Sequence, residues 1–276
     1  MLVTQYFAKD IYKGKTVFVT GGGSGINLGV AKNFAALGAN IGICGRTQQK
    51  LDDAAQELRA LGAQVCPVAA DVRDITALQA AFARCKAECG PIDVLVCGAA
   101  GNFVVPAEKL SANGFKTVID IDLIGSFNAS SAAFEQLKET RGTILYLSAG
   151  MAYVPHAYQA HVGAAKAGID MLMKNLALEW GRYGIRTNSI VPGPIEGTEG
   201  MKRLSTAATR ATLLESVPLR RVGSVDDVGQ TAVFLASPLA SFISGCVVVC
   251  DGGANLAGSG RFNAGAEGVL REQGKL

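Results

Sequence analysis

The chain has 276 residues, of which 49% are hydrophobic and 18% are charged, and its formal net charge is only +3. With so small a charge and no long basic run, nucleic acid is not an expected partner, and no apolar run reaches the roughly 18 residues of a membrane helix. Seven cysteines without a Cys-x-x-Cys pair, and only two histidines, argue against a metal site and are typical of a reducing compartment, for which we expect the cytoplasm.

Strand and helix patterns alternate along the chain. Short apolar runs predict strands at Thr16–Thr20, Asn40–Cys44, Gln64–Ala69, Ile92–Cys97, Gly142–Ser148, Arg186–Val191 and Gly245–Cys250. Apolar residues at helical spacing predict helices at Gly25–Leu37, Thr47–Leu61, Ile75–Glu88, Asn113–Lys138, Gln159–Tyr183 and Val225–Ala236. Because nearly continuous apolar strands are typical of a parallel sheet covered on both faces, we predict one α/β domain over residues 1–276. Its architecture would be a Rossmann-like doubly wound parallel sheet of about seven strands flanked by helices.

The first predicted strand ends on a glycine-rich turn that opens a helix. Glycines let backbone N–H groups approach a pyrophosphate, and the helix N-terminus adds partial positive charge. Such a turn can also join a strand to a helix without any ligand. Because this one opens an alternating strand–helix pattern, we predict a dinucleotide-phosphate site formed by Thr20, Gly21, Gly23, Ser24, Gly25 and Ile26.

The end of the second predicted strand carries an arginine, Arg46, where an acidic residue would bind a ribose 2′-hydroxyl and select NAD. A guanidinium offers charge-assisted hydrogen bonds to a 2′-phosphate, so we predict NADP(H) as the cofactor. Asp71, after the third strand, is placed either to meet the adenine or to cap the helix that starts near Ile75.

Two segments fit no regular element. Residues 192–209 follow the sixth strand and predict a loop with a short helix. Since ligands of open α/β sheets bind beyond the carboxyl ends of the strands, this loop is a candidate substrate lid. The glycine- and charge-rich residues 255–276 predict a C-terminal tail, or an arm that packs on another subunit.

Several further motifs occur in one order along almost the whole chain. They are Cys97-Gly-Ala-Ala-Gly101, Asp122-Leu-Ile-Gly-Ser-Phe127, Ser148, Gly163-Ala-Ala-Lys166-Ala-Gly168, Pro192-Gly-Pro-Ile195 and Asp251-Gly-Gly253. In this order and spacing the chain resembles the short-chain dehydrogenase/reductase family. The resemblance implies that Val72, Pro192, Gly193 and Ile195 also contact the cofactor, and that Lys166 binds its nicotinamide ribose.

The chain departs from the family pattern at three positions. Val162 stands four residues before Lys166, where the family places its catalytic tyrosine; Asp122 replaces an asparagine; and Asn27 replaces the last glycine of the cofactor turn. The helix after that turn must therefore accept a side chain. Without the tyrosine, either the protein is a catalytically silent NADP-binding protein, or its acid comes from another residue.

A closer resemblance supports the second possibility, that the acid comes from a residue other than the tyrosine. Gly101-Asn-Phe103, Asp120-Ile-Asp122, His161-Val-Gly-Ala-Ala-Lys166 and Pro192-Gly-Pro-Ile-Glu-Gly-Thr-Glu-Gly200 together resemble the 2,4-dienoyl-CoA reductases, most closely the peroxisomal type, which also lacks the tyrosine. That resemblance implies NADPH-dependent reduction of a 2,4-dienoyl-CoA to a 3-enoyl-CoA in the β-oxidation of unsaturated fatty acids. The alternatives are a generic short-chain dehydrogenase or 3-oxoacyl reductase, which would want a tyrosine at 162, or the silent binder.

The same resemblance assigns roles to individual residues. Asn102 would meet the thioester oxygen as negative charge develops there, and Asp122 would supply the proton, directly or through a water. Asp120 lies on the opposite side of its helix, so only one of the two acids can face the site. The implied substrate contacts are Arg46, Arg73, Phe103, Ser111 and Arg203.

The implied partner is an acyl-CoA thioester, and the family resemblance implies a homotetramer. The chain ends in Gly274-Lys-Leu276, which is a poor match to the Ser-Lys-Leu peroxisomal address. A peroxisome is therefore the alternative to the cytoplasm that we expect.

Overall fold

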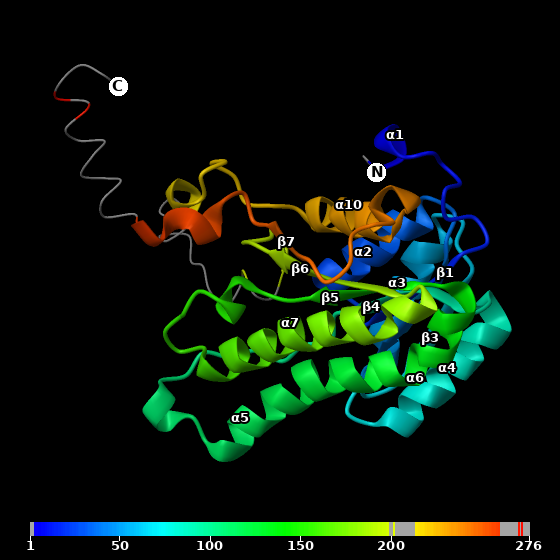
Figure 1. Cartoon of the computed structure of the whole chain (residues 1–276), viewed down its shortest axis with the longest axis horizontal. Helices are drawn as coiled ribbons and strands as arrows, with labels where there is room; N and C mark the ends of the chain where they lie inside the picture. Colours follow the sequence, from blue (N-terminus) through cyan, green and yellow to red (C-terminus); the bar gives the residue numbers. More distant parts are fainter. Residues whose placement is uncertain (1–2, 199–200, 202–212, 260–269, 271, 273–276) are drawn as a thin grey trace.

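A computed structural model describes residues 3–198, 201, 213–259, 270 and 272 (Figure 1). Its centre is one parallel sheet in the order β3-β2-β1-β4-β5-β6-β7. The strands are β1 Thr16–Thr20, β2 Asn40–Gly45, β3 Val65–Ala69, β4 Ile92–Cys97, β5 Thr143–Leu147, β6 Arg186–Pro192 and β7 Val247–Cys250. The predicted single doubly wound α/β fold is confirmed.

Two layers of helices cover the sheet. The helices are α1 Val3–Tyr6, α2 Gly25–Ala35, α3 Gln48–Arg59, α4 Ile75–Cys89, α5 Ala112–Ile119, α6 Gly125–Thr140, α7 Ala160–Trp180 and α10 Val225–Ala236. Figure 1 shows α2 and α10 on one face and α6 and α7 on the other. Side chains of α3 share the core of the first face and those of α4 share the core of the second. Apolar side chains are therefore buried on both faces of the sheet, as the continuous apolar strands predicted.

The short helical turns are η1 Ala107–Lys109, η2 Asp120–Ile124, η3 Gly150–Ala152, η4 Gly181–Tyr183, η5 Pro238–Ala240 and η6 Ala254–Ser259. Five are 3₁₀ turns, but η2 is a π-helical turn between α5 and α6. The prediction of one helix over Asn113–Lys138 is therefore wrong in one respect, because the α-helical ladder is interrupted at Asp120. A π turn places an extra residue in one turn of a helix and often lies at a functional site. Here it contains Asp122.

Candidate active site

The carboxyl ends of the strands border two adjoining cavities. The larger, of about 980 Å³, runs from the glycine turn after β1 past the loop after β4 to Lys166. The smaller, of about 560 Å³, is lined by Met151, Val162 and Met201. The two cavities share Ile26, Ala100, Asn102, Ser148, Lys166, Pro192 and Thr198. A long ligand lying in the larger cavity could thus meet a second ligand in the smaller one beside Lys166.

The glycine turn has the backbone that phosphate binding requires. Gly21 has φ +69° and Gly25 has φ +59°, a region that favours glycine. Ser24 precedes α2 in an extended conformation, and its side chain forms no capping hydrogen bond. The first backbone N–H groups of α2 therefore stand beside the larger cavity, which Ser24, Gly25 and Ile26 line.

Asn27 fits into the packing of this turn. Its side-chain amide donates to the backbone oxygen of Gly21 at 3.1 Å and to that of Gly98 at 2.8 Å. The helix thus accepts the side chain that the departure from glycine requires.

The ends of β2 and β3 carry three charged residues. Arg46 is exposed at the end of β2. The Arg73 guanidinium forms a fork with the Asp71 carboxylate, with Nη2–Oδ2 at 2.6 Å and Nε–Oδ1 at 3.0 Å. Arg73 is the main cause of the lowered pKa of Asp71. The alternative that Asp71 caps α4 is wrong, because Asp74 is the N-cap and accepts from the N–H groups of Thr76 and Ala77.

Asp122 and Lys166 form a buried ion pair where the two cavities meet, since Lys166 lines both of them and Asp122 lines the smaller one. The Oδ2 atom of Asp122 lies 3.2 Å from Lys166 Nζ, and its Oδ1 atom accepts from the backbone N–H of Gly101 at 2.7 Å. Lys166 Nζ also donates to the Leu147 oxygen at 3.0 Å. Asp122 is fully buried and Lys166 is 7% exposed. These contacts join η2, α7, the end of β5 and the loop after β4 at one point.

The neighbouring acid points elsewhere. Asp120 forms an ion pair with Lys116 on the surface of α5, one helical turn away. The π turn therefore sends one carboxylate into the molecule and the other toward solvent. Only Asp122 of the two lines a cavity.

The comparisons with known proteins agree with this geometry. A family model described as "Enoyl-(Acyl carrier protein) reductase" matches residues 21–255. The peroxisomal 2,4-dienoyl-CoA reductase SPS19 of Saccharomyces cerevisiae, named as (3E)-enoyl-CoA-producing, is 44% identical over 88% of this chain and 85% of its own length. The structure of a short chain dehydrogenase from Bacillus anthracis is 40% identical, with a TM-score of 0.80 over 88% of this chain and 97% of that one.

The chain belongs to the short-chain dehydrogenase/reductase family. Its resemblance to the 2,4-dienoyl-CoA reductases is confirmed at the same time. Another solved member, a gluconate 5-dehydrogenase from Burkholderia cenocepacia in complex with NADP and tartrate, is 30% identical, with a TM-score of 0.84 over 91% of this chain and all of that one. The protein is thus an oxidoreductase of this family.

The position of the family's tyrosine is apolar in this short-chain dehydrogenase/reductase. Val162 is buried against Val118 and Ala165 and lines the smaller cavity. Tyr153 is half exposed and its hydroxyl accepts from Asn255 at 3.2 Å, while Tyr158 is exposed. Among the described residues that line the two cavities there is no tyrosine.

Two of the predicted substrate residues, Ser111 and Phe103, lie on either side of Gly114: a Cβ atom added there would lie 3.2 Å from Ser111 Oγ and 3.3 Å from Phe103 Cζ. Ser111 is the N-cap of α5, where its hydroxyl accepts from the Gly114 N–H at 3.0 Å. Phe103 is partly exposed at the rim of the larger cavity. Arg203 falls outside the described residues.

His161 begins the motif that ends at Lys166. It is fully buried, and its ring packs on Phe103 with centroids 4.3 Å apart. Burial lowers the pKa of this imidazole, against a smaller opposing effect of the Phe103 backbone and the charge of Asp122.

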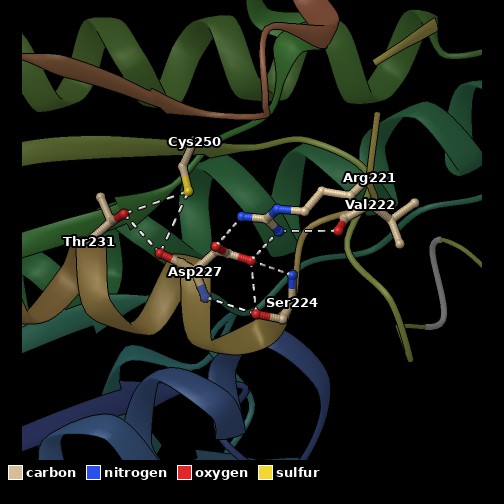
Figure 2. A network of polar contacts seen from close by, with 6 residues as sticks. All are labelled: Arg221, Val222, Ser224, Asp227, Thr231 and Cys250. Atoms are coloured by element: carbon tan, nitrogen blue, oxygen red, sulfur yellow. Dashed lines mark hydrogen bonds and ion pairs between the residues drawn. The ribbon is translucent and has the colours of Figure 1, made fainter. Parts of the chain in front are cut away.

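The loop after β6 closes on itself near the site. The Glu196 N–H donates to Gly223 O at 2.8 Å, and the Gly223 N–H donates to Pro194 O at 2.9 Å. Figure 2 shows how the returning chain joins α10: the Arg221 guanidinium pairs with Asp227 at 2.7 and 2.9 Å, and Asp227 forms a capping box with Ser224. Much of the predicted lid, 192–209, lies outside the described residues.

The described residues lack two further kinds of feature. Within the ranges that the structure covers, no three His, Cys, Asp or Glu side chains are grouped as a metal site. No helix among them is long and apolar enough to cross a membrane.

Proposed function

We propose that this protein reduces 2,4-dienoyl-CoA thioesters to 3-enoyl-CoA with NADPH, in the β-oxidation of unsaturated fatty acids. The observation that carries the proposal is the buried Asp122–Lys166 pair at the junction of two cavities, with apolar Val162 at the family's tyrosine position. The name of the yeast relative supports the substrate and the product.

The larger cavity fits an NADP cofactor. Its glycine turn presents backbone N–H groups, and Arg46 stands at the end of β2 with its guanidinium in solvent. When bound, the reduced cofactor supplies the hydride. The residues that would hold it are Thr20, Gly21, Gly23, Ser24, Gly25, Ile26, Arg46, Asp71, Val72, Lys166, Pro192, Gly193 and Ile195.

Asn102, Lys166 and Asp122 divide the chemistry of the substrate. Reduction at the δ-carbon moves negative charge to the thioester oxygen, and Asn102, which lines both cavities, donates to that oxygen. Lys166 holds its positive charge at the junction, oriented by the Leu147 oxygen and by Asp122. The ion pair holds its proton on Lys166, beside the ionised Asp122 that lines the smaller cavity. We assign the protonation of the α-carbon to Asp122, acting directly or through a water, with the proton that passes to it from Lys166 across their 3.2 Å contact.

The substrate contacts are proposals as well. Phe103 and Ser111 would line the path of the thioester, and Arg46 would contact the substrate as well as the cofactor. Arg73 and Arg203 would meet the phosphates of coenzyme A. The predicted lid, residues 192–209, is held near its start where the Gly223 N–H donates to Pro194 O, and it would cover the acyl chain.

One experiment separates this function from its rivals. We would mix the protein and NADPH with 2,4-hexadienoyl-CoA or with acetoacetyl-CoA and follow the absorbance of NADPH. Oxidation with the diene alone supports the proposal, and oxidation with the ketone alone supports a 3-oxoacyl reductase or generic dehydrogenase. NADPH binding without oxidation supports a silent binder. NMR of the product then shows whether its double bond lies at carbon 3, as proposed, or at carbon 2.

Assembly and compartment need tests of their own. We propose a homotetramer from the family resemblance, and native mass spectrometry would measure its mass. The yeast relative is named as peroxisomal, which favours the peroxisomal alternative over the cytoplasm that we expected. A fluorescent fusion, imaged with a peroxisomal marker in cells of the source organism, decides between the two.

A further inference from the structure

Asn27 connects two loops that both border the cofactor cavity. It stands in the first turn of α2 and itself lines the cavity of about 980 Å³. Its side-chain amide donates to Gly21 O, in the turn after β1, and to Gly98 O, in the loop after β4. One side chain thus joins the phosphate-binding turn to the neighbouring loop.

The connection depends on the absence of a side chain at residue 98. A Cβ atom added to Gly98 would lie 2.1 Å from Asn27 Oδ1 and 2.6 Å from Asn27 Cγ. A Cβ on Gly21 would lie 2.8 Å from Asn27 Nδ2. Contacts this short cannot form, so the asparagine occupies the space that a side chain at residue 98 would need.

The loop after β4 continues directly to the catalytic pair. At its start, Thr20 Oγ1 accepts from the N–H groups of Gly98 and Ala99 at 3.1 and 3.3 Å. At its end, the Gly101 N–H donates to Asp122. The loop is therefore fixed by Thr20 and Asn27 at one end and by Asp122 at the other.

We propose that Asn27 is a positioning residue that couples the phosphate turn to the loop carrying Gly101 and Asn102. The amide holds Gly21 and Gly98 at a fixed separation, so the turn is preorganised for the cofactor and the loop is preorganised for Asp122. The substitution of asparagine for the family's glycine is matched by the lack of a side chain at residue 98. The catalytic half of this inference rests on the proposed function; the cofactor half rests on the larger cavity alone.

The test uses Asn27→Gly, Gly98→Ala and the double variant. NADPH dissociation constants come from fluorescence, thermal stability from calorimetry, and KM for NADPH and kcat from the diene assay. Asn27→Gly should weaken NADPH binding about tenfold, because the turn that binds the pyrophosphate loses both amide hydrogen bonds that hold it. Gly98→Ala should lower the melting temperature, and adding Asn27→Gly should restore it without restoring NADPH affinity.

A matched control is Asn40→Ala. Asn40 also donates a side-chain amide hydrogen bond to a backbone oxygen, that of Cys89 at 2.9 Å, but it lies at the start of β2, away from the cavity. This variant should leave NADPH affinity within twofold of the wild type.

Two results would overturn the inference. One is an Asn27→Gly variant that loses thermal stability but binds NADPH as the wild type does, which would make the asparagine merely structural. The other is additive stability changes in the double variant. If the wild type fails to reduce the diene while Asn27→Gly still weakens NADPH binding, the proposed function fails and the cofactor half of the inference stands.

Discussion

The two ends of the candidate site are built in opposite ways. At the inner end, Asp122 and Lys166 are buried, and backbone groups of Gly101 and Leu147 complete their contacts. At the outer end, Arg46 is exposed, and the fork of Arg73 with Asp71 lies at the surface. Both ends carry opposite charges in proximity, yet only the inner charges are removed from water.

This difference predicts which substitutions will lower the free energy of unfolding most. Breaking a buried ion pair from one side costs about 3–5 kcal/mol, because the remaining charge stays buried without its partner. An exposed pair contributes only about 0–1 kcal/mol. Substitutions in the Asp122–Lys166 pair should therefore cost most stability, while the outer end can change its ligand preference without loss of the fold.

The largest effect should come from Asp122→Asn. The amide can still accept from Gly101 but cannot neutralise Lys166 or supply a proton, so kcat for the diene should fall by roughly 10²-fold or more. The unfolding free energy should fall as well, whereas the dissociation constant for NADPH should stay close to that of the wild type. Stopped-flow kinetics, urea denaturation and fluorescence titration measure the three quantities.

The matched control for that variant is Asp120→Asn. This carboxylate lies on the same π-helical turn but pairs with exposed Lys116. We expect its kcat to stay within twofold of the wild type. Equal losses in both variants would show that the turn as a whole, and not Asp122, supports turnover.

Arg46→Ala should give the next largest effect, measured here on cofactor binding. A charge-assisted hydrogen bond to a 2′-phosphate is worth about 1.5–3 kcal/mol, so NADPH should bind roughly 10- to 100-fold more weakly. NADH, which has no such phosphate, should bind the variant and the wild type alike. If the variant lost affinity for both dinucleotides equally, the outer end would not select NADP.

Much of the fold was predictable because each strand appears in the sequence as a short apolar run. The bounds of β1 and α10 agree with the prediction at both ends. The break between α5 and α6 was not predictable, because apolar spacing continues through it and a π turn adds only one residue to a helical turn. Periodicity therefore placed Asp122 on the right element but could not give its local geometry.

The site was predictable where a cluster of glycines, or a charged residue among small ones, is uncommon outside a binding site. The turn around Gly21 was identified by its composition, and the small residues around Lys166 marked that lysine. Contacts between distant loops, such as that of Asn27 with Gly98, left no trace in local spacing. The cap of α4 was ambiguous for another reason: Asp71 and Asp74 both precede the helix, and only three-dimensional placement shows that Asp74 accepts its N–H groups.

A smaller effect, on pH dependence, should come from His161→Phe at the inner end. The pKa of this buried imidazole is lowered, so below about pH 6.5 the unfolded chain binds a proton more readily than the folded one. The wild type should therefore lose stability as the pH falls below 6.5, by up to about 1 kcal/mol per group between pH 6.5 and 5.5. Phenylalanine keeps the ring packing on Phe103 and removes this loss.

Denaturation with urea at both pH values measures the difference. The control is His156→Phe, since His156 is exposed and its Nδ1 atom lies 2.8 Å from the nearby Val154 oxygen. That variant should keep the pH dependence of the wild type. The same pH dependence in His161→Phe would mean that other titratable groups, and not this imidazole, cause the loss of stability in acid.

The smallest effect should come from Arg73→Ala at the outer end. The Asp71 carboxylate already accepts hydrogen bonds from the Arg73 guanidinium. Because this ion pair is exposed, its loss should change the unfolding free energy by less than about 1 kcal/mol. If Arg73 also meets the phosphates of coenzyme A, KM for the dienoyl-CoA should rise only a few-fold, since Asp71 competes for the same cation. At 1 M salt, where charges are screened beyond about 3 Å, the rise should disappear.

A dienoyl-pantetheine substrate, which lacks the nucleotide phosphates, makes this prediction specific. The KM for this substrate should be the same with the wild type and with Arg73→Ala. The control variant Arg84→Ala breaks the exposed pair with Glu88 on α4, and it should change neither the KM for the dienoyl-CoA nor the KM for the dienoyl-pantetheine. A rise for both substrates in Arg73→Ala would mean that the fork shapes the loop after β3 and makes no phosphate contact. The outer end would then resemble the inner end in holding structure, and burial alone would no longer separate the two.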